Sequence, residues 1–555
     1  MKLPDRIDPE SIPRPPPGGI PECEPNYPGG FRGLFKSRII LGWAIFASIG
    51  SFLFGYDQAV FSGVLVLHGF QHQFPRIAGS TQLQGWAVSV LQIGALIGAF
   101  VNSPIADKIS RRYSISIACV IYLIGTTLQG VALNEIMLLI GRILSGFSIG
   151  QLSMAVPLWI GEIAPLNIRG SALGLHQLAI AIGIMTAFWI NYGVQYVHND
   201  QSTLLEAAWR MPLLIRALPC LVLLTGSVWF MPFSPRWLIK VRRSREALDT
   251  IARLRNWYID GSEANNEYSQ IKASAVAEEE MMLKKFPNAK THFQRSIKLY
   301  REMFTQRHLL RRVIVACGLQ VFQQLSGINA IVSYAPQLFL SLKLGNTSVS
   351  LLVTAMIGIV NVLSTLFAIS AVDRFGRRPV LIIGATGMTI CHLVIASLYA
   401  YYESKWASNP AAGWTTVIFV WLFVVNFAYS AGCISWIYPS EIFPLGVRSQ
   451  AMGVAVAANW ASNFLIGLFT PVLLAKIRYG TFFLFAGCTL ALLIWVSVSL
   501  PETKGVSIED MDKLWGAPSN ESFDEEVKQE CHVSEAEDKE EVETAASSIV
   551  VGPKK

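Results

Sequence analysis

The eight residues Glu162-Ile-Ala-Pro-Leu-Asn-Ile-Arg169 return as Glu441-Ile-Phe-Pro-Leu-Gly-Val-Arg448 with five of the eight identical, and each copy follows a long apolar run. A second motif repeats at matched places, because Asp107-Lys-Ile-Ser-Arg-Arg112 corresponds to Asp373-Arg-Phe-Gly-Arg-Arg378. A third pair closes the two halves of the chain. Three repeats in the same order indicate an internal duplication. The third pair is Pro232-Phe-Ser-Pro-Arg236 and Pro501-Glu-Thr-Lys504.

The sequence between these motifs is strongly apolar. Of the 555 residues, 52 % are hydrophobic and only 15 % are charged. The apolar residues come in runs of about 20, and a helix of that length spans a bilayer core of about 30 Å. Backbone amides must be satisfied internally in lipid, so each run has to be a helix. We therefore predict an all-α membrane protein with 12 transmembrane helices. The predicted spans are 38–60, 83–103, 113–133, 136–157, 171–193, 211–231, 310–334, 348–371, 379–402, 414–438, 450–472 and 480–500.

The distribution of Lys and Arg predicts the orientation. The net charge is +7, but the basic residues cluster in the joints after spans 2, 4, 8 and 10, which does not favour a nucleic-acid partner. Basic joints stay on the cytoplasmic side, so both tails are predicted to be cytoplasmic. The predicted organisation is a cytoplasmic tail (1–37), a six-helix bundle (38–231), a cytoplasmic helical linker (232–309), a second six-helix bundle (310–500) and a largely disordered cytoplasmic tail (501–555).

Span 7 carries an unusual number of carboxamides. Gln320, Gln323 and Gln324 lie three or four residues apart and share a helix face, and Asn329 follows. Carboxamides donate and accept hydrogen bonds without a fixed charge, which matches the hydroxyl groups of a sugar. The alternative is that the amides join helices to one another. Two halves related by duplication place a transport site between them, near the midplane.

The motifs together resemble the sugar-porter branch of the major facilitator superfamily over about residues 40–510. The resemblance rests on the paired motifs above and on Gln323-Gln324-x-x-Gly327-x-Asn329. Phe54-Gly-Tyr-Asp-Gln58 and Met231-Pro-Phe-Ser-Pro-Arg-Trp237 most resemble fungal members. The resemblance implies the major facilitator fold and a sugar-binding site. Gln320, on the same helix face as Gln323 and Gln324, would add one more amide to that site. The substrate-binding residues implied in this way are Gln177, Gln323, Gln324, Asn329, Asn361, Trp436 and Asn459.

The resemblance also implies a coupling pair and a gate. It places Asp57 of span 1 beside Arg142 of span 4, as in proton symporters, and a carboxylate within a span by default suggests a proton route. A merely structural ion pair is the alternative. Across the cytoplasmic ends of the spans, the charged residues of the first Asp-Arg-Arg motif would pair with those that follow span 4 and with the second-half counterparts of both, and so hold that side shut. The predicted gate residues are Asp107, Arg111, Arg112, Glu162, Arg169, Asp373, Arg374, Arg378, Glu441 and Arg448.

Several positions depart from the family pattern. Ile184 stands where relatives carry Gln, Cys433 follows Gly432 where Pro is usual, and Phe233 replaces Glu. Ser110 replaces a glycine in the first copy of its motif. Arg216 stands where fungal relatives often carry Gln. If it faces the pathway it favours an anionic sugar acid, whereas snorkelling to the outer interface is the simpler expectation.

The predicted function is secondary active import of a hexose or pentose by alternating access, coupled to protons. Its alternatives are a facilitative sugar uniporter, a carrier of sugar acids or quinate-like polyols, and a non-transporting sugar sensor. Gly146-Phe-Ser-Ile-Gly150 matches a hydrolase pattern but lies within a span. Small residues four apart, here and at Gly94 and Gly98, predict close helix packing instead. We expect no enzyme activity, cofactor or metal. The expected partners are a sugar, protons and the lipid bilayer, and the expected location is the plasma membrane.

Overall fold

The computed structural model describes residues 31–196, 202–259, 261–285, 292–403, 405–444 and 447–504, with 506, 511, 514 and 515. Within these residues, 12 segments are long and apolar enough to cross a membrane. The sequence-based prediction of 12 spans in an all-α protein is therefore confirmed. Most of the predicted C-terminal tail and most of the N-terminal tail lie outside the described residues.

The first half contains six spans, two of which are built from two helices each. The halves of span 1 meet at Ser48, and those of span 6 meet at Arg216. Short helices α4 (His68–Gln73) and α5 (Pro75–Gly79) join spans 1 and 2. In chain order the spans are α2 (Arg38–Ala47) with α3 (Ile49–Val64), α6 (Thr81–Ile109), α7 (Arg111–Gly130), α8 (Glu135–Ile163), α9 (Leu166–Val194), and α10 (Ser202–Ile215) with α11 (Ala217–Trp229).

The second half repeats this arrangement, with breaks in its first and fourth spans. Span 7 breaks at Gly327, whose φ is +88°, and span 10 breaks at Ser430. A short 3₁₀ helix (Trp406–Ser408) precedes span 10. In chain order the spans are α16 (Arg307–Leu325) with α17 (Ile328–Ser341), α18 (Thr347–Phe375), α19 (Arg377–Tyr402), α20 (Pro410–Tyr429) with α21 (Ala431–Ile442), α22 (Arg448–Lys476) and α23 (Gly480–Ser499).

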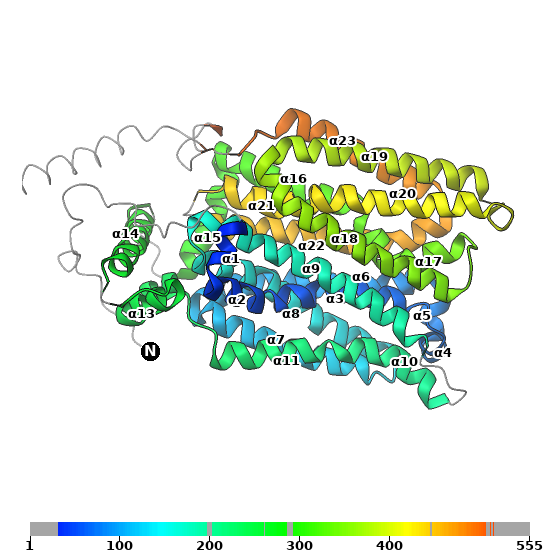
Figure 1. The fold of residues 1–555 in the computed structure, drawn as a ribbon, viewed down its shortest axis with the longest axis horizontal. Helices are drawn as coiled ribbons and strands as arrows, with labels where there is room; N and C mark the ends of the chain where they lie inside the picture. The colour runs from blue at the N-terminus through cyan, green and yellow to red at the C-terminus, as the bar shows by residue number, and fades with distance from the viewer. Residues whose placement is uncertain are drawn as a thin grey trace, which may run out of the picture.

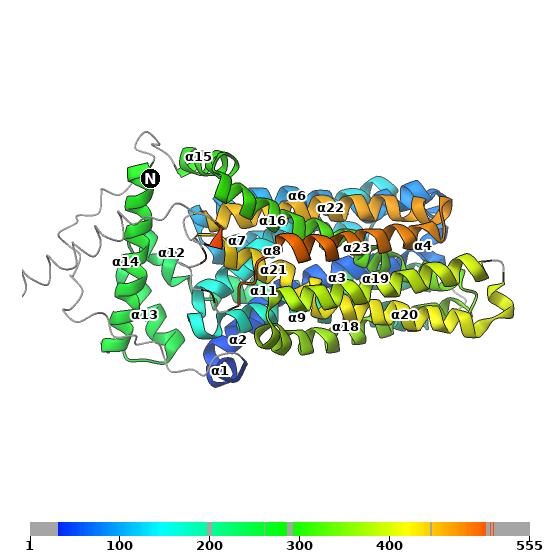
Figure 2. The ribbon, with the colours of Figure 1, turned by 90° about the horizontal axis from the view of Figure 1, so that it is seen from above.

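Five further helices lie at one end of the bundle. These are α1 (Phe31–Lys36), α12 (Pro235–Lys240), α13 (Ser244–Arg255), α14 (Ser262–Lys285) and α15 (His292–Thr305). Helices α12 to α15 lie within the segment 232–309, which the sequence predicts to be a helical linker. Figures 1 and 2 both place α13 and α14 beyond the ends of the spans, on the left, and α4 at the opposite end. We call these the linker end and the loop end of the molecule.

Small residues let the helices approach closely. A Cβ atom at Gly94 or Gly98 of α6 would overlap the carbonyl groups of Ile143 and Phe147 in α8, and one at Gly146 would overlap Leu91 in return. The predicted close packing of these glycines is confirmed, and the hydrolase motif has a structural explanation. Backbone contact of this kind is how membrane helices associate without a hydrophobic driving force between them.

The two halves meet most closely toward the loop end. Helix α6 packs on α22, α9 on α18, and α3 on α17. A Cβ at Gly85 would lie 2.5 Å from the carbonyl oxygen of Leu468, and one at Gly358 would lie 2.5 Å from the Cα of Met185. Gln337 donates a hydrogen bond to Gln84 across the same seam, at 3.4 Å. The seam is therefore closed at the loop end in this structure.

Candidate functional site

The carboxamides predicted for a sugar site form one connected network. Asn459 of α22 donates to the Oε1 atoms of Gln320 and Gln323 at 2.6 and 2.7 Å, and accepts from Gln324 at 3.1 Å. Asn329 of α17 donates to Gln324. All but Asn329 are buried. Five of the predicted residues, drawn from three helices, are thus brought together at the break in span 7.

The break itself explains why the amides can converge. Gly327 has a positive φ, and a Cβ there would lie 2.9 Å from the ring of Phe485. Only glycine adopts this backbone readily, so the sequence ends α16 and starts α17 at this point. The new helix begins at Ile328 and brings Asn329 back toward Gln324.

The network also reaches the tenth span. Gln320 donates to the carbonyl of Ser435 at 2.8 Å, and Gln323 donates to that of Ala431 at 3.1 Å. Gln320 is 0 % exposed and uses both ends of its amide on protein partners. Its geometry fits the helix-joining alternative. Gln323 and Gln324 are 5 % exposed and lie closer to the seam.

The other predicted binding residues come from three more helices. Gln177 of α9, Asn361 of α18 and Trp436 of α21 are all half-buried. The side-chain oxygen of Gln177 has no hydrogen-bond partner among the described residues. The ring of Trp436 meets that of His176 edge to face, with centroids 6.2 Å apart. This contact joins the two halves beside Gln177.

His176 is a polar residue that the predicted site set left out. It is buried on α9, and its Nδ1 lies 2.5 Å from the hydroxyl of Ser51 on α3. Its ring packs against Trp436 of the opposite half. The sequence signal was its position directly before Gln177. The seam is further closed near Asn459, where Phe54 of α3 packs on Trp460 at 5.0 Å between ring centroids.

The buried carboxylate of span 1 has a different partner from the one predicted. Asp57 forms an ion pair with Arg216, and neither side chain is exposed. The predicted pairing with Arg142 is therefore wrong for this structure. The expectation that Arg216 snorkels to the interface is also wrong, because the kink between α10 and α11 turns the guanidinium inward. There its Nε donates to the carbonyl of Leu213 at 2.9 Å.

Arg142 occupies a neighbouring buried position without a carboxylate. Its guanidinium lies 3.9 Å from the centre of the Phe61 ring and donates to the carbonyl of Val88 at 3.0 Å. The Nε and Nη1 atoms have no hydrogen-bond partner among the described residues. Two buried arginines and one aspartate therefore gather in the first half.

At the linker end, the repeated motifs form equivalent ion pairs. Arg111 binds Glu162 at 3.0 Å in the first half, and Arg377 binds Glu441 at 2.8 Å in the second. The contact of Arg111 with Glu162 is one of the pairings expected among the gate residues, and each arginine begins a helix that lies beside its own partner glutamate. Arg377 was missing from the predicted gate, although the repeat aligns it with Arg111.

The remaining gate residues are also arranged symmetrically. Arg112 donates to the carbonyl of Ser227 at 2.8 Å, and its counterpart Arg378 donates to that of Ser497 at 2.5 Å, so each ties a helix start to the end of the last span of its half. Arg169 and Arg448 donate to the carbonyls of Ala164 and Phe443. Arg374 is exposed and lies over the ring of Phe375. The side chains of Asp107 and Asp373 lie outside the described part of the chain.

The two copies of the helix start differ in a coordinated way. Glu502 accepts from the backbone N–H groups of Arg377 and Arg378, each at 2.9 Å, and so caps α19. A Cβ at Gly376 would lie 2.8 Å from the Glu502 Oε2, so this cap requires glycine. In the first copy Ser110 takes the same positive φ and caps α7 with its own hydroxyl. Ser110 and Phe233 thus replace the glycine and the glutamate of the family pattern together, because Ser110 supplies the cap that the glutamate would otherwise make.

Phe233 replaces the cap with a ring contact. It lies 4.8 Å below the guanidinium of Arg112 and stacks on Trp237 at 5.4 Å. A cation over a ring face is stabilising by about 0.5–1 kcal/mol at exposed sites. The first copy therefore retains a hold on its arginine without a carboxylate.

The titration of Glu502 reflects its cap. Burial alone would raise the pKa of its carboxyl. Hydrogen bonds from the backbone N–H groups of Arg377, Lys504, Arg378 and Thr503 outweigh burial and hold the pKa below its ordinary value. Glu502 is therefore an anion fixed at the start of α19.

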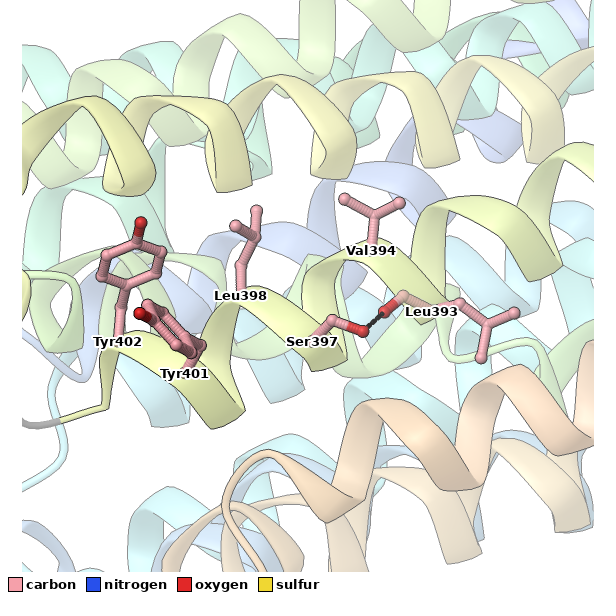
Figure 3. A pocket seen from close by; sticks show the side chains of 6 residues that line it. All are labelled: Leu393, Val394, Ser397, Leu398, Tyr401 and Tyr402. Carbon is pink, nitrogen blue, oxygen red and sulfur yellow. Dashed lines mark hydrogen bonds between the residues drawn. The ribbon is translucent and has the colours of Figure 1, made fainter.

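A separate depression lies on the outer face of the second half. It has a volume of about 340 Å³, and its lining residues all belong to α19. Figure 3 shows Leu393, Val394, Leu398 and Tyr401 along this helix, with the hydroxyl of Ser397 hydrogen-bonded within the helix to the carbonyl of Leu393. Its walls are mostly apolar and include none of the predicted site residues, so we do not assign the substrate to it.

The chain matches the family model "Sugar (and other) transporter" over residues 43–515. Its relatives include Sugar transport protein 7 of Arabidopsis thaliana, 35 % identical, with 87 % of this chain and 92 % of the relative covered. The MFS glucose transporter mfs1 of Aspergillus flavus is 32 % identical, with 85 % and 88 % covered. The high-affinity hexose transporter HXT6 of Saccharomyces cerevisiae is 31 % identical, with 85 % and 80 % covered.

Solved structures of one bacterial transporter share the fold. The proton:xylose symporter XylE, bound to 6-bromo-6-deoxy-D-glucose, superposes with a TM-score of 0.69 at 27 % identity, covering 86 % of this chain and 99 % of that one. The inward open conformation of XylE from E. coli gives a TM-score of 0.66 at 26 % identity, covering 86 % of this chain and all of that one. The predicted fold is therefore confirmed, and the chain belongs to the sugar-porter family of the major facilitator superfamily.

Proposed function

We propose that this chain imports a hexose or pentose by alternating access, with the sugar held at the broken span 7. The observation that carries the proposal is the buried carboxamide network of Gln323, Gln324, Asn329 and Asn459 at the seam. Each of these groups donates and accepts without a net charge. Names of relatives from plants and fungi describe sugar, glucose and hexose transporters, which supports the same substrate class.

The sugar enters this network by exchange of hydrogen bonds. Gln323, Gln324 and Asn329 now bond one another or nearby backbone, and sugar hydroxyls would take over part of these bonds. Gln177 of α9, whose carboxamide oxygen has no hydrogen-bond partner among the described residues, and Asn361 of α18 would complete the polar lining. Trp436 would stack on the apolar face of the ring. Gln320 is a support for Gln323 through Asn459 in this scheme.

Transport requires the seam to open at each end in turn. The loop end is closed here by α6 against α22 and by α3 against α17. At the linker end, Glu162 and Glu441 bind arginines of their own halves. We propose that these glutamates exchange partners across the halves when the linker end closes. Exposed pairs contribute about 0–1 kcal/mol each, so a network is needed to bias two such states.

Proton coupling is proposed through Asp57. It is a buried carboxylate in span 1, and such groups within membranes are rare and costly unless they serve a route or a pair. XylE, whose solved structure shares the fold of this chain, is named a proton:xylose symporter. A sugar-acid carrier loses its sequence support, because Arg216 is neutralised by Asp57 and does not offer a free cation to a substrate. We propose the plasma membrane as the location, with both tails cytoplasmic.

The test is uptake of labelled sugars into proteoliposomes, with and without an imposed inward proton gradient. We expect accumulation of a hexose or pentose above equilibrium only with the gradient. A competition panel of hexoses, pentoses and sugar acids identifies the preferred substrate. Equilibration without accumulation would establish a uniporter, and absence of both uptake and exchange would refute the proposal.

Matched variants separate binding from folding. Trp436→Leu and Gln324→Ala should raise the KM for uptake at least tenfold. Thr415→Ala is the control, because its exposed hydroxyl bonds only to the carbonyl of Ala411 in its own helix. Equal uptake by all three variants at low sugar concentration would remove the amide network from the proposed site.

A further inference from the structure

Asp57 pairs with one buried arginine, and a second buried arginine lies over the ring of Phe61 on the same helix. Arg216, at the joint of α10 and α11, holds the Asp57 carboxylate directly, and both side chains are 0 % exposed. The joint aims Arg216 because its Nε donates to Leu213, one turn earlier. Tyr122 of α7 covers the other side of the guanidinium, with its ring centre 5.6 Å away.

Arg142 approaches the same face of α3 one turn further along. Its guanidinium sits on the ring of Phe61, four residues after Asp57. Residues at this spacing are neighbours on one helix face, and a helical turn rises about 5.4 Å. Arg142 is therefore a second buried cation on the side of α3 that carries Asp57, and it lies over the ring of the residue one turn further along.

The second cation is incompletely satisfied. Arg142 donates to the Val88 carbonyl, but its Nε and Nη1 find no partner among the described residues. A buried charge without an anion is strongly unfavourable.

We propose that Arg216 is the positioning residue for Asp57 and that it holds the carboxylate of span 1 in its ionised form until protonation releases the ion pair. This inference rests on the proposed proton coupling through Asp57. With Asp57 ionised, the three side chains carry a net charge of +1. When a proton from the water-filled pathway bonds to a carboxylate oxygen, the ion pair breaks and the net charge becomes +2. Two buried cations then repel one another, and the arrangement described here loses stability relative to an opened one.

The surroundings contain few other groups that could carry this charge. The titratable groups that pack around the cluster are Tyr56 of α3, Cys119 and Tyr122 of α7, His176 of α9, Cys220 of α11 and Tyr334 of α17. Tyr56 and Tyr334 donate to the carbonyls of Pro212 and Gly467, at 2.8 Å each. His176 contacts Ser51, nearly two turns from Asp57. Among the described groups of the cluster and its surroundings named here, Asp57 alone carries a carboxylate.

The experiment measures the pH profile of sugar uptake for Arg216→Gln, Arg216→Lys and Arg142→Gln. Removing the cation that contacts Asp57 should move the pH of half-maximal uptake upward by one unit or more in Arg216→Gln. Arg216→Lys retains the charge and should restore the wild-type profile. Arg142→Gln should shift the profile by less than half as much, because in the resting arrangement it does not contact Asp57. Arg210→Gln is the matched control, since Arg210 lies on α10 and donates to the carbonyl of Gly130.

An unshifted profile in Arg216→Gln, or a larger shift in Arg142→Gln, would overturn the assignment. Sugar exchange at equal concentrations, which needs no proton gradient, shows in each variant whether the sugar site is intact. A wild type that exchanges sugar without any pH dependence would refute proton coupling rather than the ion pair.

The ion pair itself is tested by thermal unfolding in detergent. The Tm losses of Asp57→Asn and Arg216→Gln should be far from additive in the double variant. Those of Asp57→Asn and Arg142→Gln should be closer to additive. The reverse result would assign Arg142 as the resident partner.

Discussion

Glu502→Ala should uncap the start of α19 and loosen the linker end of the second half. The carboxylate accepts from the N–H groups of Arg377 and Arg378, and also from those of Thr503 and Lys504, at 2.9–3.0 Å. Loss of an N-cap costs about 1 kcal/mol. Loss of an anion at a helix N-terminus costs a further 0.3–1 kcal/mol or so. The expected destabilisation is therefore about 1–2 kcal/mol.

This loss should be visible both in stability and in its pH dependence. In the folded protein the pKa of Glu502 is lowered, so its contribution is present above the ordinary glutamate value of about 4.3 and is lost as the pH falls below it. Thermal unfolding in detergent should give a lower Tm for Glu502→Ala at pH 7. The difference from wild type should shrink as the pH approaches 4. At the same time Arg377 loses its backbone anchor, so the pair with Glu441 should weaken.

The control exchanges the equivalent residue in the first copy. Phe233→Ala removes a ring contact to Arg112 but no cap, because Ser110 caps α7 itself. Its Tm loss should not depend on pH between 4 and 7. A Tm difference for Glu502→Ala that stays constant over this range would refute the reasoning, because it would show that the carboxylate charge is not what holds the helix start.

Three other predictions concern the site and the seam. Asn459→Ala leaves the side-chain oxygens of Gln320 and Gln323 without their donor. A hydrogen bond between membrane helices contributes about 0.6 kcal/mol, so the Tm should fall slightly, and the KM for sugar uptake should rise. Gly327→Ala meets the Phe485 ring at 2.9 Å and a positive φ, so it should cost more than 1 kcal/mol and reduce uptake, whereas Gly487→Ala, with open space around its Cα, should be neutral in both measurements. Gly85→Val should wedge α6 from α22, and alkylation of a cysteine introduced at Gln337 should become faster; an unchanged rate would show that the seam does not close there.

Periodicity and repetition were sufficient to predict the fold and the network of amides. Apolar runs of span length leave few alternatives to helices in lipid, and Gln320, Gln323 and Gln324 share a face by their spacing alone. The convergence of Asn459 on that face could not come from spacing, since it lies on a helix more than 130 residues away, as the separation from Gln323 shows. Asn459 was predicted from the family resemblance, and the structure shows its hydrogen bonds to Gln320 and Gln323.

The pairing of charges was the part that sequence could not predict. Each buried or half-buried arginine had several acidic candidates, and the choice depends on helix rotation and on kinks. The direction of Arg216 is an example. Pro219 has no N–H to donate to the carbonyl of Ile215, so a break near Arg216 could be predicted, but the break alone does not show which carboxylate the guanidinium meets. Arg377 could have been predicted as a partner of Glu441 only by aligning the two copies of the repeat, which matches it with Arg111.

The repeat also explains how one half can differ from the other without loss of structure. A Ser at position 376 would collide with Glu502, and a Glu at position 233 would find its helix N-terminus already capped by Ser110. Each pair is therefore matched within its own half: a side chain at position 376 would clash with the capping glutamate, and a glutamate at position 233 would have no cap left to make. Substitutions that look like departures when read singly are, in the folded chain, paired solutions to the same requirement: an arginine held at a helix start, beside the seam between the halves.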